Sequence, residues 1–84
     1  MEYSRARGKL PPELAGLTPA QLDNVIHEAN LGLADTHIAQ RAMIDQLMHI
    51  DIAVEMGLDR STVSWRLRRL TPKVVERAKN NLPQ

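Results

Sequence analysis

The stretch from Ile50 to Leu70 constrains the possible fold more than any other part of the chain. It reads IDIAVEMGLDRSTVSWRLRRL and contains two apolar runs at helical spacing, separated by Gly57. These runs consist of Ile52, Ala53 and Met56, followed by Val63, Leu67 and Leu70. Glycine lets the first helix end in a left-handed conformation, and Asp59 belongs to the residue types that cap the free amides of a following helix. Two short helices joined by such a turn form a helix-turn-helix, which we expect here.

An earlier helix is predicted from a capping signature. Thr18 is suited to cap a helix whose first residue is Pro19, and Gln21 stands at the reciprocal position of a capping box. Asn30 and Gly32 supply the stop signal for this helix.

A second Thr-Pro pair, Thr71-Pro72, predicts a boundary near the end of the chain. Because the residue before a proline is disfavoured in the helical conformation, the helix that begins at Arg60 should stop or kink there. His49 occupies the capping position before the third helix, where Ser or Thr is more usual. We expect helices over about residues 19–29, 34–47, 50–56, 60–70 and 73–80.

The composition favours a small all-α domain of four to five helices. The 84 residues include no Phe, one Trp and one Tyr, so the core must be aliphatic. We expect a flexible basic N-terminal arm over residues 1–17, with one helical turn near Glu13, and a helix-turn-helix domain over residues 18–84. Two interpretations of the arm stay open, since such segments can lie in the minor groove of DNA or simply be disordered.

Charge is partitioned along the chain although the net charge is only +1. Residues 1–9 carry a net charge of +2, residues 10–59 a net charge of −7, and residues 60–84 a net charge of +6. The positive charge therefore begins directly after the predicted turn. This pattern suits a phosphate surface, and the alternative is an ordinary solvated helix.

Other classes of chemistry find little support in the sequence. The chain has no cysteine, and His27, His37 and His49 lack the spacing that places two metal ligands on one helical face. The glycines are scattered singly, so no phosphate-binding loop is present. We expect no enzyme activity, no catalytic residues, no cofactor, no metal and no small-molecule substrate. We also expect no membrane association and a cytoplasmic location.

The predicted helix from Arg60 to Leu70 has the composition of a DNA-recognition helix. Its apolar arc of Val63, Leu67 and Leu70 should face the core, which leaves hydroxyl groups, a tryptophan and arginines on other faces. Small hydroxyl side chains allow close approach to DNA, and arginine can pair with guanine. The predicted DNA-binding residues are Arg60, Ser61, Thr62, Ser64, Trp65, Arg66, Arg68, Arg69 and Lys73. Among them, the side chains expected to reach into the groove are those of Thr62, Ser64, Trp65 and Arg68, and those expected mainly on phosphates are Arg60, Arg66, Arg69 and Lys73.

Trp65 has two interpretations that the sequence leaves open. On the exposed side of a basic helix, it could contact thymine methyl groups or sugars. It could equally contact a partner protein or cover the core. The arginines have an alternative too, as solvated residues of a surface helix.

The run GLDRSTVSWRLRRL resembles the Gly-apolar-x-Arg-Ser-Thr-Val-Ser-x-x-Leu run of bacterial helix-turn-helix regulators. The stretch from about Asp35 to Leu70 is similar to region 4 of sigma-70-type factors, including small relatives from phages and mobile elements. The resemblance implies a four-helix unit whose last helix reads promoter DNA, with RNA polymerase as a possible partner. It assigns Ala53, Gly57 and Val63 to the scaffold. It assigns Arg60, Ser61, Thr62, Ser64, Trp65 and Arg68 to the DNA face.

Two functional hypotheses follow from the sequence. The first is a sequence-specific DNA-binding transcription regulator of bacterial or phage type, with a homodimer as the expected but open oligomeric state. The second is a protein-interaction module built on the same scaffold, with RNA polymerase or a phage packaging or recombination component as partner. Transposase and resolvase domains share the motif, and the chain has no room for the sigma domain that binds the −10 element, so full sigma activity is not expected.

Overall fold

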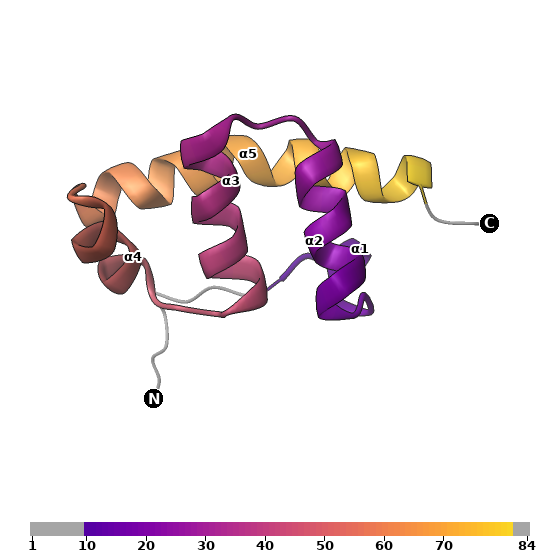
Figure 1. Cartoon of the computed structure of the whole chain (residues 1–84), viewed down its shortest axis with the longest axis horizontal. Helices are drawn as coiled ribbons and strands as arrows, with labels where there is room; N and C mark the ends of the chain where they lie inside the picture. Colours follow the sequence, from indigo (N-terminus) through magenta and orange to yellow (C-terminus); the bar gives the residue numbers. More distant parts are fainter. Residues whose placement is uncertain (1–9, 82–84) are drawn as a thin grey trace.

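One long helix, α5 (Arg60–Asn81), runs along the molecule, and the shorter helices pack across it (Figure 1). The structure is a computed structural model that describes residues 10–81. The shorter elements are α1 (Pro12–Ala15), α2 (Pro19–Glu28), α3 (Leu33–Ala39), a π-helical segment η1 (Gln40–Ile44) and α4 (His49–Met56). Figure 1 shows α4, α3 and α2 lying against α5 in this order from the Arg60 end toward the C-terminal end. Within residues 10–81 the fold is compact and all-helical, with five α-helices and no strand.

Helix α2 begins as its capping signature predicts. The Gln21 backbone N–H donates to Thr18 Oγ1 at 3.1 Å, and the Thr18 N–H donates to Gln21 Oε1 at 2.9 Å. Pro19 stands at the first helical position, where its missing N–H is not needed. After α2, Asn30 and Gly32 both adopt positive φ angles, 60° and 94°, which confirms the predicted stop.

The second predicted helix ends earlier than expected. α3 starts at Leu33 and continues as η1 only to Ile44, whereas the prediction extended to about Leu47. Gln46 lies in the left-handed region with φ 56°, which turns the chain before Leu47. The next helix begins one residue before the prediction, with Met48 at the cap and His49 as its first residue. The expectation that His49 is the cap is therefore wrong.

The predicted end of a helix at Thr71-Pro72 is also wrong, because α5 continues through Pro72 as a single helix. The apolar residues on both sides of the proline stay in helical register, and they are all buried: Leu67, Leu70, Val74 and Ala78. Ending the helix would break this continuous stripe. Pro72 itself is exposed, so its ring does not disturb the core. The separate fifth helix expected over residues 73–80 is the second half of α5, and its stripe packs on the domain.

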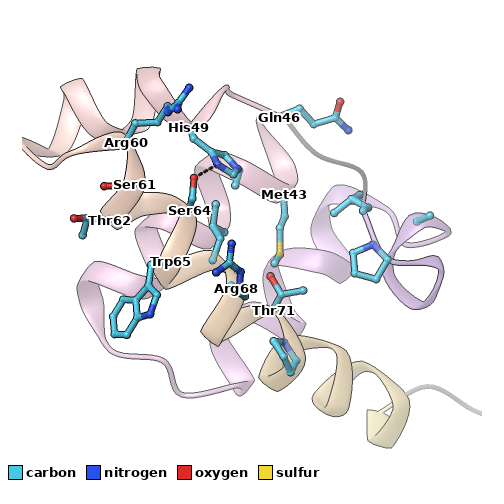
Figure 2. Close-up of a pocket in the computed structure, with 16 residues that line it drawn as sticks. Met43, Gln46, His49, Arg60, Ser61, Thr62, Ser64, Trp65, Arg68 and Thr71 are labelled. Atoms are coloured by element: carbon cyan, nitrogen blue, oxygen red, sulfur yellow. Dashed lines mark hydrogen bonds between the residues drawn. The ribbon is translucent and has the colours of Figure 1, made fainter. Parts of the chain in front are cut away.

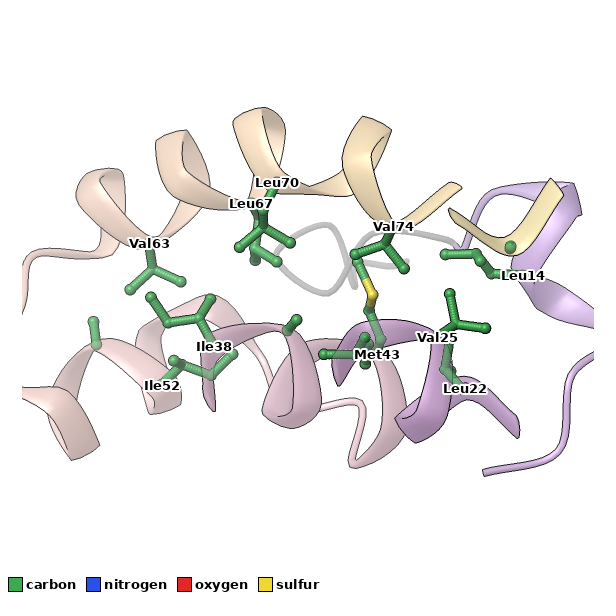
Figure 3. Packing of buried hydrophobic residues seen from close by; sticks show 14 residues of the cluster. Leu14, Leu22, Val25, Ile38, Met43, Ile52, Val63, Leu67, Leu70 and Val74 are labelled. Carbon is green, nitrogen blue, oxygen red and sulfur yellow. The ribbon is translucent and has the colours of Figure 1, made fainter. Parts of the chain in front are cut away.

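The core is wholly aliphatic, as the composition predicts, and no polar residue is buried within residues 10–81. Figure 3 shows two ends of this core along α5: Val63 packs beside Ile38 and Ile52, and Val74 lies near Val25 and Leu14. Among the described residues fourteen are buried, and they include Leu22, Ile26, Ala39, Met43 and Ala53 as well.

The N-terminal boundary differs from the expectation. Leu14 on α1 is fully buried, and Leu10 and Leu17 pack against the core. Residues 10–17 therefore belong to the packed domain, whereas the arm was expected to extend to residue 17. Residues 1–9, which carry the basic part of the expected arm, lie outside the described residues. None of the helices in the described part of the chain is long and apolar enough to cross a membrane.

Candidate nucleic-acid interface

The turn between α4 and α5 fixes the direction of the candidate recognition helix. Gly57 adopts φ 70° and ψ 33°, and the Leu58 N–H donates to the Ala53 carbonyl at 2.9 Å. The Gly57 N–H contacts the Val54 carbonyl, which completes the hydrogen-bond pattern of a Schellman motif. Leu58 then packs against the core and anchors the start of α5. The predicted glycine turn is confirmed in this detail.

Asp59 contributes to the start of α5 through its backbone. Its carbonyl accepts a hydrogen bond from the Val63 N–H at 3.1 Å. Within residues 10–81 its carboxylate accepts no hydrogen bond from a backbone N–H, so the predicted side-chain cap is absent. A carboxylate at this position still interacts favourably with the positive end of the helix dipole.

The N-terminal half of α5 has one anchored face and one open face. Val63, Leu67 and Leu70 are at most 8 % exposed and pack on α3 and α4. An open groove of about 1510 Å³ runs along another side of this half of α5 and reaches as far as Leu67. The predicted residues that line this groove are Arg60, Ser61, Thr62, Ser64, Trp65 and Arg68 (Figure 2).

The other side of the groove comes from residues outside α5. Leu10 and Pro11 line it just before α1, and Met43 and Gln46 line it from η1 and the residues that follow. His49 contributes from the first turn of α4. The sequence analysis did not assign any of these five residues to a site. No local signal identifies them, because the fold brings them to α5 from distant parts of the chain.

Three predicted site residues lie outside the groove lining: Arg66, Arg69 and Lys73. Arg66 instead faces α3, where its Nη1 donates to Asp35 Oδ1 at 2.9 Å. Both side chains are about one-third exposed, and Arg66 Nε is buried without a partner within residues 10–81. Arg66 therefore holds α5 against α3, and its expected role on phosphates is not supported by its position.

Ser64 lines the groove but already has a partner. His49 Nδ1 lies 2.7 Å from Ser64 Oγ, which links α4 to α5 (Figure 2). Burial, followed by the positive charge of Arg60, lowers the pKa of His49 below its usual 6.5. The ring is therefore neutral near pH 7.

Trp65 is 52 % exposed, so it does not cover the core. The Arg69 guanidinium lies over its ring, 4.8 Å from the ring centre, at the distance of a cation–π contact. This contact orders both side chains on the outer side of α5 without neutralising the arginine.

The cations on the outer side of α5 have no carboxylate partners within residues 10–81: Arg60, Arg68, Arg69 and Lys73. No acidic residue lines the groove either. The interface thus combines exposed donors, a hydroxyl-rich first turn and an exposed indole on one helix. It offers positive charge and hydrogen-bond donors to an anionic ligand.

The described residues contain no group of three or more His, Asp or Glu side chains placed to hold a metal ion. Comparison of the chain with protein-family models, with curated proteins and with solved structures gives no match.

Proposed function

We propose that this domain binds double-stranded DNA sequence-specifically and acts as a transcription regulator. In this proposal the first half of α5 enters the major groove, and α4 positions it. The observation that carries the proposal is the open face of α5. Unpaired cations, hydroxyl groups and an exposed indole share this face, and the opposite face is fixed in the core.

The residues on this face have distinct expected roles. Ser61 and Thr62 stand in the first turn, where small side chains allow the helix to approach base edges. Arg68 is long enough to reach a guanine with two parallel hydrogen bonds. Arg60, Arg69 and Lys73 are suited to phosphates, which fix orientation without reading sequence.

The resemblance to region 4 of sigma-70-type factors supports a bacterial, phage or mobile-element regulator that works in the cytoplasm. RNA polymerase is the additional protein partner that this resemblance suggests. A homodimer would place two copies of α5 on a palindromic site, with half-sites separated by about one helical turn of DNA.

The direct test is selection of bound sites from random duplexes, followed by affinity measurements at several salt concentrations. We expect a defined sequence, with log K falling against log salt by about 0.9 for each phosphate contact. A palindromic product would also report two-fold symmetry. Binding that is insensitive to salt, or no binding to any duplex, would contradict the proposal.

A second candidate function is a protein-interaction module on the same scaffold. Three large apolar side chains favour it, since Trp65 is 52 % exposed and Ile50 and Val54 on α4 are 45 % and 75 % exposed. Exposed apolar side chains are common on protein surfaces, which makes this the weaker candidate. The discriminating variants are Trp65→Ala and Arg68→Ala. If only the tryptophan variant loses a protein partner, and duplex DNA does not compete with that partner, the second function is favoured.

A further inference from the structure

His49 connects the two helices of the helix-turn-helix at the edge of the groove. It is the first residue of α4, and its half-buried ring lies beside α5. Its Nδ1 is 2.7 Å from Ser64 Oγ, so the side chain of the opposite helix holds the ring in place (Figure 2). A histidine held in this way presents its second nitrogen in a defined orientation.

The surroundings of this ring suit an anion. Within residues 10–81, His49 Nε2 has no hydrogen-bond partner. The charged groups that line the groove with it are Arg60 and Arg68, both from α5. From η1 and the residues after it come Met43 and Gln46, which are uncharged. The residues that line the groove before α1 are uncharged as well, and no carboxylate lines it.

We propose that His49 contacts a DNA phosphate through Nε2 and that Ser64 is the positioning residue that fixes its ring. The inference rests on the proposed DNA binding and extends the contacting surface from α5 to α4. When Nδ1 accepts the hydrogen of the Ser64 hydroxyl, the neutral ring carries its proton on Nε2. This tautomer can donate to a phosphodiester oxygen beside Arg60.

The contact couples DNA binding to protonation. Without DNA, burial and Arg60 keep the pKa of His49 below 6.5. A phosphate at Nε2 stabilises the imidazolium and raises this pKa in the complex. Because the complex then takes up a proton, affinity increases as the pH falls between the two pKa values, by up to about tenfold per pH unit.

The first experiment measures the affinity for a selected duplex between about pH 5.5 and about pH 8 at constant ionic strength. Wild-type protein is expected to bind more tightly at lower pH. His49→Gln keeps a hydrogen-bond donor but cannot titrate, so its affinity should not vary over this range. The matched control is His27→Gln, because His27 is exposed on α2 and bonds to Asp23 of its own helix. This control should keep the wild-type profile.

The role of Ser64 has its own readout. Ser64→Ala should reduce the pH dependence of DNA affinity. Ser64→Thr retains the hydroxyl and should show the pH dependence of the wild-type protein. If Ser64 had a purely structural role, Ser64→Ala would lower the stability of the fold without changing the pH profile of DNA affinity.

A measurement on the unmutated protein avoids any question of folding. NMR titration of the His49 imidazole should give a higher pKa with the duplex than without it. An unchanged pKa, or a wild-type pH profile in His49→Gln, would overturn this inference and leave DNA binding intact. Failure of the wild-type protein to bind any duplex at any pH would overturn the proposed function and this inference together.

Discussion

Arg41 and Arg68 are the same side chain in two different settings. Arg41, on η1, donates to Asp45 at 2.7 Å and uses Nε and Nη2 to bind both oxygens of Glu55 on α4. Arg68, on α5, is exposed and borders the groove without a carboxylate partner within residues 10–81. The first arginine joins two parts of the fold, and the second leaves its donors open to a ligand.

This difference follows the charge partition of the sequence. Arg41 is the only cation between residues 10 and 59, where the net charge is −7, so carboxylates surround it. The pairing raises the pKa of Arg41 and lowers the pKa of Glu55 to about 2. From residue 60 onward the net charge is +6, and there are too few acids to neutralise the arginines. Arg41, before the turn, is therefore structural, whereas Arg68, after the turn, is available for binding.

The largest expected effect is on DNA binding by Arg68→Ala. Removing this side chain should weaken binding to a selected duplex by about 1–3 kcal/mol if it contacts a base. Arg41→Ala removes the same charge, but its side chain is already bound to carboxylates. It should leave affinity close to wild type. Fluorescence anisotropy with labelled duplex measures both values, and circular dichroism checks that both variants are folded.

Equal losses in these two variants would break the comparison. Net charge, rather than the position of the cation on α5, would then govern binding. A second measurement with a scrambled duplex separates a base contact by Arg68 from a contribution that does not depend on DNA sequence. Arg68→Ala should lose more affinity for the selected sequence than for the scrambled one, since a base contact contributes to specificity.

Arg66 is an intermediate case, because it lies on α5 but pairs with Asp35 on α3. Asp35→Ala should lower the free energy of unfolding by about 1 kcal/mol, since it leaves a half-buried guanidinium without its partner. Urea denaturation of Asp35→Ala, Arg66→Ala and the double variant gives a double-mutant cycle, which measures the coupling energy between the two side chains. Arg66→Ala should affect DNA binding less than Arg68→Ala. If the coupling energy between Asp35 and Arg66 is zero and Arg66→Ala loses much of the DNA affinity, Arg66 contacts DNA rather than holding α5 against α3.

Parts of the fold that depend on neighbouring residues are predictable from the sequence. The Thr18 capping box and the Gly57 turn involve residues within a few positions of each other. The continuation of α5 through Pro72 is different, because Val74 and Ala78 gain their burial from α1 and α2, far away in the chain. Local propensity predicts a break there, and packing against distant elements outweighs it.

The candidate site divides in the same way. Helical periodicity is sufficient to place Trp65 and Arg68 on an open face. It does not reveal that Ser64 bonds to His49, 15 residues away, or that Arg66 bonds to Asp35, 31 residues away. Those pairings depend on how α3 and α4 pack on α5, which no local spacing encodes.

A smaller effect, on the pH dependence of stability, is expected from Glu55, which pairs with Arg41. The hydrogen bond from Arg41 is the main cause of the lowered pKa of Glu55, about 2 against an ordinary 4.5. Between these values the unfolded chain binds a proton that the folded protein does not, so this contribution to stability is complete above about pH 4.5 and is lost as the pH falls toward 2. Thermal melts at a series of pH values should show a weaker acid dependence for Glu55→Gln than for wild type.

The matched control for Glu55 is Glu76→Gln. Glu76 is exposed on α5 and makes no ion pair among the described residues. Its variant should retain the wild-type acid dependence. If Glu55→Gln and Glu76→Gln show the same acid dependence of thermal stability, the ion pair of Arg41 with Glu55 does not stabilise the fold.

The smallest expected effect concerns Arg69, whose guanidinium lies 4.8 Å from the centre of the Trp65 ring. The coupling between these exposed side chains should be about 0.5 kcal/mol in a double-mutant cycle of stability. An aromatic ring attracts the guanidinium without neutralising its charge. Arg69→Ala should therefore lower the salt slope of DNA binding by about 0.9, whereas Trp65→Leu should leave the slope unchanged. An equal decrease in both variants would mean that the ring is required to hold Arg69 at its phosphate. Arg69, like Arg41, would then depend on an intramolecular partner, although that partner leaves its charge available to DNA.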